Sequence, residues 1–333
     1  MKKVLIIMAW ILCSIVLLAI IGGGYLIYKV NTQLHNGGKI VEWSENNGRE
    51  LLNLQYGEQA RNNYDLYIPK VGKPNALMLF IHGGSWISGQ KEDIAYEARR
   101  YAQHGYITAT MNYSRLGTDT INSQTFDKPS IFSMMSEITM VITAIKNKCA
   151  EMGYNLTQMA IGGYSAGGHL AMLYATKHNN DSPLPIKFQI SWVGPSDMNS
   201  LFPSDAIITA ITTTESEQES ASQKGAMNYI HNIIGHEIEI NNLTKEHLDS
   251  LKSNISPIDY VNTTTPPAIL AYGAIDKLVN AEHGRQISST LSKNGIENKL
   301  FVFPNSGHEL GNDTEYTLMV EKAILEFCTN YFE

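Results

Sequence analysis

The residue most suited to chemistry in this chain is a serine in a turn rich in small residues. Residues 163–167 read GYSAG, so Ser165 lies in a G-x-S-x-G turn between a short apolar segment and a helical one. Small residues beside such a serine relieve crowding, and the hydroxyl can project above a sheet from a strained backbone. It would also lie at the amino end of a helix, where the dipole favours developing negative charge. The alternative for the pentapeptide alone is a serine that caps a helix after a strand.

A second glycine motif supports the chemical interpretation. Residues 82–86 read HGGSW and directly follow the apolar run 76–81. Glycines at this position allow backbone N–H groups to point into a site, and Gly83 and Gly84 together with Ala166 would form an oxyanion hole. Each donor of such a hole contributes about 3–4 kcal/mol to transition-state stabilisation. We expect His82 to orient this loop, because the acid and the base of this arrangement follow the serine in the chain.

The acid and the base are predicted from their places after strands. Asp276 follows the strand-like run 268–272, and His308 ends a loop after the run 299–303. Open α/β sheets place their sites at the carboxyl ends of strands, so both side chains are expected beside the serine. Serine is a poor nucleophile at neutral pH. His308 would take its proton and later protonate the leaving group, while Asp276 would fix the imidazole tautomer.

Other residues near these motifs receive simpler interpretations. Asp197 is a rival for the acid, but it would leave Asp276 unexplained. His169 lies one helical turn after the serine, and packing explains it better than catalysis. Trp86 and Tyr164 are candidates to line a substrate pocket, with ordinary packing as the alternative.

The elements that must position these residues alternate between strand-like and helix-like segments, which predicts βαβ units and a mostly parallel sheet flanked by helices. Asn199–Val261 interrupts the alternation. It is rich in Thr, Ser, Glu and Asn, with weaker helical stretches at 226–234 and 244–251, and we interpret it as a small helical cap inserted between two core strands. The predicted strands are 66–68, 76–81, 106–111, 159–161, 190–193, 268–272 and 299–303, and the predicted helices are 94–104, 129–149 and 317–332.

The four motifs HGGSW, GYSAGGHLA, YGAIDKLV and PNSGH, in this order, resemble the α/β-hydrolase superfamily. The resemblance is strongest to its carboxylesterase branch, akin to hormone-sensitive lipase and the bacterial esterase/lipase group. It covers roughly residues 64–332 apart from much of the insertion, and HGGSW departs from the HGGG form common in that branch. The resemblance implies an α/β-hydrolase fold, a triad of Ser165, Asp276 and His308, and an oxyanion hole made by Gly83, Gly84 and Ala166.

Composition excludes several other classes of protein. The 333 residues are 43% hydrophobic and 17% charged, which argues against a disordered or fibrous chain. The net charge of −7 argues against a nucleic-acid partner, because such proteins usually carry a basic face. Three cysteines form neither a disulfide framework nor a zinc site, the histidines show no metal-ligand spacing, and we expect no cofactor. Cys149 and Cys328 fall on separate predicted helices and are expected to be buried thiols.

The first thirty residues differ from the rest. Val4–Tyr28 contains no charged residue, and about 20 apolar residues suffice for a helix to cross a bilayer. We predict that residues 1–30 form an N-terminal transmembrane anchor, with a cytoplasmic amino end and an extracytoplasmic domain over 31–333. A cleaved signal peptide, followed by secretion, is the alternative. Residues 1–30 hold three lysines and no acid, so the body carries −10 against −7 for the whole chain, and the anchor would have to hold this acidic body at the membrane.

These observations predict a membrane-anchored serine esterase that hydrolyses short-chain or acetyl esters through an acyl-enzyme. Two alternatives stay open. The same machinery serves amide hydrolysis, as in an arylformamidase or a peptidase. A hydrolase fold can also act as a non-catalytic binding module, although such proteins usually have lost the serine or the histidine that this chain keeps at positions 165 and 308.

Overall fold

The computed structural model describes residues 41–72, 75–121, 128–205, 207–208, 233 and 244–333. The predicted anchor over 1–30 lies outside these residues, as does most of the helical stretch predicted at 226–234. Within the described part of the chain, no helix has the length and apolar character needed to cross a bilayer.

The core is an eight-stranded sheet in the order β1-β2-β4-β3-β5-β6-β7-β8. β1 and β2 pair antiparallel to each other, and β2 pairs antiparallel to β4, whereas all pairs from β4 to β8 are parallel. The strands are β1 (Gly48–Gln55), β2 (Asn63–Pro69), β3 (Ala76–Ile81), β4 (Ile107–Met111), β5 (Gln158–Tyr164), β6 (Ile186–Trp192), β7 (Ala268–Gly273) and β8 (Asn298–Phe303). The prediction of a mostly parallel α/β sheet is confirmed.

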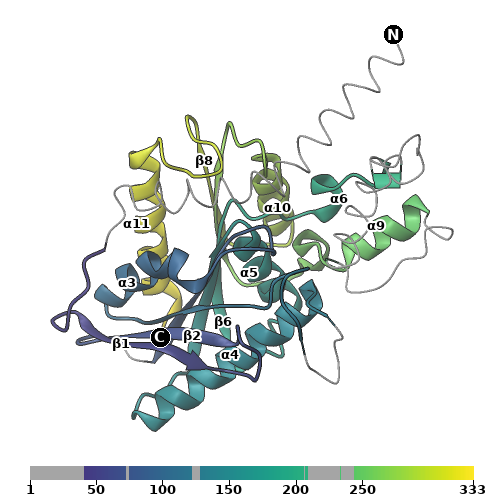
Figure 1. Cartoon of the computed structure of the whole chain (residues 1–333). Helices are drawn as coiled ribbons and strands as arrows, with labels where there is room; N and C mark the ends of the chain where they lie inside the picture. Colours follow the sequence, from purple (N-terminus) through teal and green to yellow (C-terminus); the bar gives the residue numbers. More distant parts are fainter. Residues whose placement is uncertain (1–40, 73–74, 122–127, 206, 209–232, 234–243) are drawn as a thin grey trace.

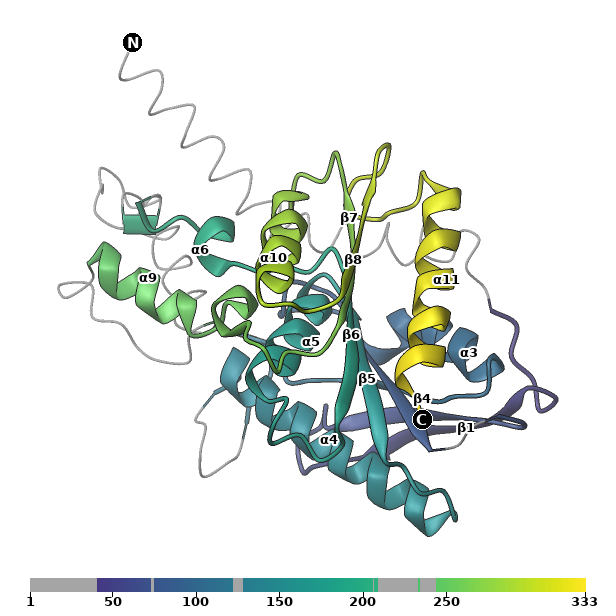
Figure 2. The same cartoon turned by 180° about the vertical axis from the view of Figure 1, so that it is seen from behind.

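Helices cover both faces of the sheet. Figure 2 shows the sheet nearly edge-on, with α4, α5 and α10 on one side and α3 and α11 on the other. Figure 1 gives the same arrangement from the opposite direction. The helices are α3 (Ala95–Gln103), α4 (Ile131–Glu151), α5 (Ala166–Lys177), α6 (Met198–Leu201), α9 (Lys245–Ser253), α10 (Glu282–Lys293) and α11 (Thr314–Tyr331), with 3-10 turns η1 (Lys91–Ile94) and η3 (Pro257–Tyr260).

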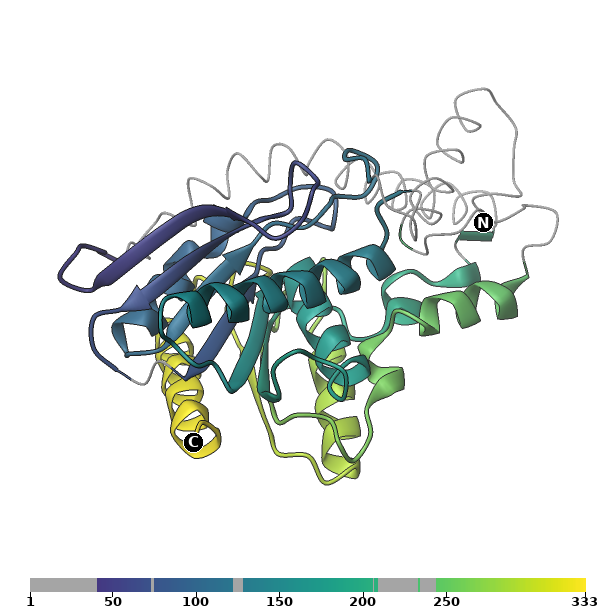
Figure 3. The same cartoon turned by 90° about the horizontal axis from the view of Figure 1, so that it is seen from below.

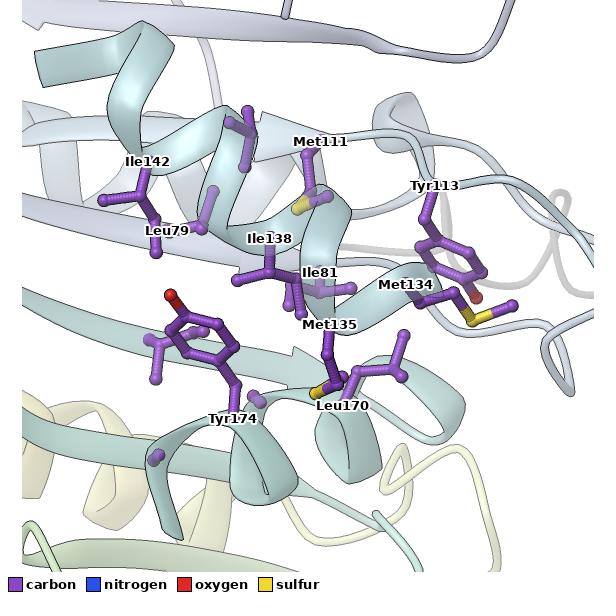
Figure 4. Packing of buried hydrophobic residues seen from close by; sticks show 14 of the residues in the cluster. Leu79, Ile81, Met111, Tyr113, Met134, Met135, Ile138, Ile142, Leu170 and Tyr174 are labelled. Carbon is purple, nitrogen blue, oxygen red and sulfur yellow. The ribbon is translucent and has the colours of Figure 1, made fainter. Parts of the chain in front are cut away.

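The apolar run of β3 is continuous because helices bury both of its faces. Leu77, Leu79 and Ile81 lie in the core under α4 and α5, whereas the alternate residues, such as Phe80, face α3 and α11. Figure 4 shows Leu79 beside Ile142 and Ile81 beside Ile138, both isoleucines belonging to α4. Helix α4 begins at a capping box in which the Ser130 side chain accepts a hydrogen bond from the Ser133 N–H.

The insertion leaves the sheet between β6 and β7. Its described residues include α6, α9 and η3, and α9 occupies the second helical stretch predicted from the sequence. Figure 3 shows α6 and α9 beside one another and away from the sheet. Its closing segment includes η3, which contacts α5. The insertion is thus attached to the helix that follows Ser165.

Candidate active site

Ser165 occupies a strained turn between β5 and α5. Its backbone has φ 54° and ψ −118°, outside the regions that most residues adopt. The Ser165 N–H donates to the Trp192 carbonyl at 2.8 Å, which fixes the turn against β6. A side chain at Gly163 would lie 2.3 Å from the Gly167 backbone, and one at Gly167 would lie 2.1 Å from the Ile81 carbonyl oxygen, so both positions require glycine for the turn to close this tightly. The sharp turn expected from GYSAG is present.

The structure brings Ser165, Asp276 and His308 together. His308 Nε2 lies 2.9 Å from Ser165 Oγ, and His308 Nδ1 lies 2.7 Å from Asp276 Oδ2. The other carboxylate oxygen of Asp276 accepts the N–H groups of Leu278 at 2.8 Å and Val279 at 3.0 Å. The carboxylate is fully buried. Since Asp276 can accept the Nδ1 proton, Nε2 is left to accept the serine proton.

The loop that carries His308 is held from two directions. A side chain at Gly273, the last residue of β7, would lie 2.2 Å from the Gly307 carbonyl oxygen, so the strand end and this loop are in direct contact. Tyr164 donates its hydroxyl proton to the His308 carbonyl at 2.6 Å. Its ring lies edge-on to the imidazole, with 6.2 Å between centroids. Tyr164 thus supports the backbone and the ring of His308. A role for Tyr164 in lining the substrate pocket stays a prediction.

The HGGSW loop passes close to the serine. A side chain at Gly83 would lie 3.3 Å from Ser165 Cβ. Gly84 has φ 115°, which favours glycine, and its carbonyl accepts the Ile87 N–H at 3.1 Å. Within the described residues, no protein group accepts a hydrogen bond from the backbone N–H of Gly83, Gly84 or Ala166. An oxyanion hole formed by these three N–H groups stays a prediction.

His82 is buried beneath this loop. Its Nδ1 lies 2.7 Å from the Gly83 carbonyl, and its ring stacks on Tyr113 at 4.3 Å. Arg61 lies 3.4 Å from Nε2 and also donates to the Gly89 carbonyl at 2.9 Å. Burial lowers the pKa of His82 from 6.5 to about 3. A neutral ring therefore donates to Gly83 and accepts from Arg61, as expected of a residue that orients the loop.

Buried neutral histidines make the stability of the fold sensitive to acid. Burial also lowers the pKa of His169 to about 4. In the unfolded chain each histidine takes up a proton near pH 6.5. The contribution of both groups is therefore complete above pH 6.5 and is lost as the pH falls towards their folded pKa values. Between pH 6 and 5, each should lower the unfolding free energy by about 1 kcal/mol per pH unit.

Urea unfolding of wild type and His82→Gln between pH 5 and 7 measures this effect. The variant should show a pH slope shallower by about 1 kcal/mol per unit. His104→Gln, at an exposed position, provides the matched control for the exchange of histidine for glutamine. Equal slopes in wild type and His82→Gln would contradict a neutral buried His82.

The remaining predicted residues have structural partners. Asp197, the rival acid, caps α6 and accepts the Asn199 N–H at 2.8 Å. His169 and Trp86 are both buried and contact one another. Cys149 and Cys328 are free and buried, as expected.

Arg61 is the residue that the sequence did not reveal. Besides Gly89 it binds the Tyr113 carbonyl at 2.9 Å and the Asn112 side chain at 3.1 Å. It lies in the turn between β1 and β2, where an arginine in a polar stretch gives no signal of these contacts. They join segments about 20 to 50 residues away in sequence, which only the folded sheet brings together.

Comparison with known proteins assigns the chain to a family. A model of the BD-FAE family matches residues 64–291, more than half of the sequence. The chain belongs to the BD-FAE family. This assignment agrees with the α/β-hydrolase resemblance of its motifs, and the matched residues of the BD-FAE chain include Ser165 and Asp276.

Curated relatives described as esterases also match the chain, and solved structures share its fold. A protein of Oryza sativa subsp. japonica, described as a probable isoprenylcysteine alpha-carbonyl methylesterase, is 34% identical over 122 residues, 36% of this BD-FAE chain and 27% of the relative. Esterase LipQ of Mycobacterium tuberculosis is 24% identical over 287 residues, 84% and 62% of the two chains. Esterase B of Lactobacillus rhamnosis has a similar fold, with a TM-score of 0.64 at 15% identity over 94% of this chain and 96% of that one. The chain spans a quarter to a half of the first curated relatives.

Proposed function

We propose that this protein is a serine carboxylic ester hydrolase that acts through an acyl-enzyme on Ser165. The observation that carries the proposal is the continuous hydrogen-bonded chain from Asp276 through His308 to Ser165, at 2.7 Å and 2.9 Å. Membership of the BD-FAE family and the esterase names of the curated relatives support the same reaction.

In the first half of the reaction, Ser165 Oγ attacks the ester carbonyl carbon while His308 Nε2 takes the hydroxyl proton. Asp276 stabilises the imidazolium and holds its tautomer. The carbonyl oxygen becomes an oxyanion, which the N–H groups of Gly83, Gly84 and Ala166 stabilise. His308 then gives its proton to the departing alcohol, and the acyl group stays on Ser165.

In the second half, a water molecule attacks the acyl-enzyme, with His308 as its base. A second oxyanion forms in the same place and collapses, His308 returns the proton to Ser165, and the carboxylic acid leaves. Every proton transfer uses Nε2, because Nδ1 faces Asp276. The substrates proposed are short-chain or acetyl esters, and an ester series from acetyl to long acyl chains tests this preference.

Amide hydrolysis is the second candidate. Kynurenine formamidase of Danio rerio is 23% identical to this chain over 124 residues, which favours a formamide over a peptide bond among amides. Assaying p-nitrophenyl acetate and an aryl formamide with the same preparation separates the two reactions. An ester hydrolase should give the higher kcat/KM with the acetate, and a higher value with the formamide would replace the proposal.

Labelling with a fluorophosphonate tests whether Ser165 reacts at all. A serine hydrolase forms a stable phosphonyl adduct on its nucleophile. The alternative of a non-catalytic binding module predicts no adduct at Ser165, and that result would favour it over any hydrolase.

We also propose that residues 1–30 anchor the protein in a membrane, since the uncharged stretch Val4–Tyr28 is long enough to span a bilayer. The full chain should stay with membranes after an alkaline carbonate wash, and a chain that starts at residue 31 should be released. Protease added to intact cells should reach the body if it is extracytoplasmic. A mature protein whose amino terminus lies beyond this stretch would establish the cleaved signal peptide instead.

A further inference from the structure

The loop next to the proposed oxyanion donors contains two strained residues in succession. Ser85 has φ 51° and Trp86 has φ 62°, although neither is glycine. A left-handed backbone costs an ordinary residue of order 1–3 kcal/mol, so it persists only where the surroundings impose it. The contacts of these residues should therefore show what holds Gly83 and Gly84 in place.

The side chain of Trp86 fixes this strained pair of residues to the core. Its ring is buried in the core on the α4 and α5 side of the sheet, with 3% of the residue exposed. Its indole Nε1 donates a hydrogen bond to His169 Nδ1 at 3.3 Å, and the two rings meet edge-on at 5.2 Å. The Trp86 carbonyl also accepts the Leu116 N–H at 2.9 Å.

His169 connects Trp86 to two other parts of the structure. It lies on the first turn of α5, where its N–H donates to the Ser165 carbonyl at 2.9 Å. Its imidazole is fully buried, and Nε2 lies 2.7 Å from the Ile255 carbonyl. A carbonyl oxygen only accepts, so Nε2 carries the proton and Nδ1 accepts from Trp86. Burial, which lowers the pKa of His169 to about 4, keeps this neutral tautomer at neutral pH.

Ile255 belongs to the closing segment of the insertion, between α9 and η3, and is fully buried. Lys177 at the end of α5 donates to the neighbouring Asn254 carbonyl at 3.1 Å, so this segment is tied to α5 at a second point. One imidazole thus joins the strained loop, the helix that follows Ser165 and the end of the insertion.

We propose that His169 is a positioning residue for the esterase reaction. Through Trp86 it holds the loop of Gly83 and Gly84, and through Ile255 it ties that loop to the insertion. This inference rests on the proposed function. Loss of the Trp86–His169 bond would let the donors move away from the developing oxyanion, and such displacement lowers kcat more than it changes KM.

Three substitutions separate this role from simple packing. Trp86→Phe keeps an aromatic ring and removes the indole N–H. In His169→Asn the side-chain amide replaces Nδ1 and can accept from Trp86, whereas in His169→Gln it replaces Nε2 and can donate only to Ile255. The matched controls are Trp43→Phe, which alters a partly buried ring against Tyr67, and His178→Gln at the end of α5.

Steady-state hydrolysis of p-nitrophenyl acetate and thermal melts of all variants test the inference. Trp86→Phe and His169→Gln should each lower kcat about tenfold with KM within about threefold, a modest part of the loss caused by removing an oxyanion donor. His169→Asn should recover most of the kcat, and the double variant Trp86→Phe with His169→Gln should lose no more than one single variant. Both controls should keep the wild-type kcat.

If the wild type is active, losses of kcat below threefold in Trp86→Phe and His169→Gln would overturn the inference. Equal losses of kcat in His169→Gln and His169→Asn would also overturn it. If Trp86→Phe fails to melt cooperatively, the two histidine variants decide the matter. An inactive wild type would instead reject the proposed function, so the two failures can be told apart.

Discussion

Ser165→Ala should lower kcat for p-nitrophenyl acetate by about 10⁴-fold or more while leaving the fold intact. The substitution removes the oxygen on which the proposed acyl-enzyme forms, whereas the proposed oxyanion donors and substrate contacts would still give a small rate above that of water. Ser165 already holds a strained φ of 54°, which alanine can inherit because the turn is fixed by its neighbours. The melting temperature should therefore change by only a few degrees.

The exposed Ser292 of α10 provides the matched control, and Ser292→Ala should keep the wild-type rate. Both variants require the same assay, with the uncatalysed rate subtracted. A Ser165→Ala protein within tenfold of wild type would mean that another group performs the reaction.

Asp276→Asn should lower kcat by about 10⁴-fold, for a reason that follows from its hydrogen bonds. The asparagine oxygen would stay with the N–H groups of Leu278 and Val279, which need an acceptor. The amide nitrogen would then face His308 Nδ1 and donate to it. Nε2 would carry the ring proton, so the imidazole could no longer accept the proton of Ser165.

Asp197→Asn is the control for this prediction, because Asp197 caps α6 and should tolerate an amide. Its kcat should stay within about threefold of wild type. If Asp276→Asn were as active as Asp197→Asn, Asp276 would not set the tautomer of His308 and would have no role in catalysis.

Much of the fold could be predicted because its strands carry strong local signals. The run of β3 is apolar on both faces, and the chain order of serine, acid and histidine placed each side chain at a strand end. Strand β1 was missed because a bulge between Leu51 and Leu54, with Asn53 at φ 58°, breaks its alternation. Helix α10 was missed because few of its residues are apolar. It also contains Gly284, where a side chain would lie 2.4 Å from the Tyr272 ring.

The site was predictable in its chemistry but less so in its supports. Ser165, Asp276 and His308 each follow a recognisable strand, so their meeting followed from topology. Arg61 and the partnership of Trp86 with His169 depend on contacts between segments far apart in sequence. The sequence left Trp86 between pocket lining and packing and favoured packing for His169, because spacing alone does not reveal a hydrogen bond between side chains 83 positions apart.

The central claim is that Ser165 is the nucleophile activated by His308. The most direct test is mass-spectrometric mapping of the protein after reaction with a fluorophosphonate. We expect one phosphonyl adduct on the peptide that contains Ser165, no adduct on Ser165→Ala, and labelling slowed by at least about a hundredfold in His308→Ala, since the general base contributes about 10²–10⁴-fold. An unlabelled Ser165 in folded wild-type protein, or equal labelling of wild type and His308→Ala, would contradict it.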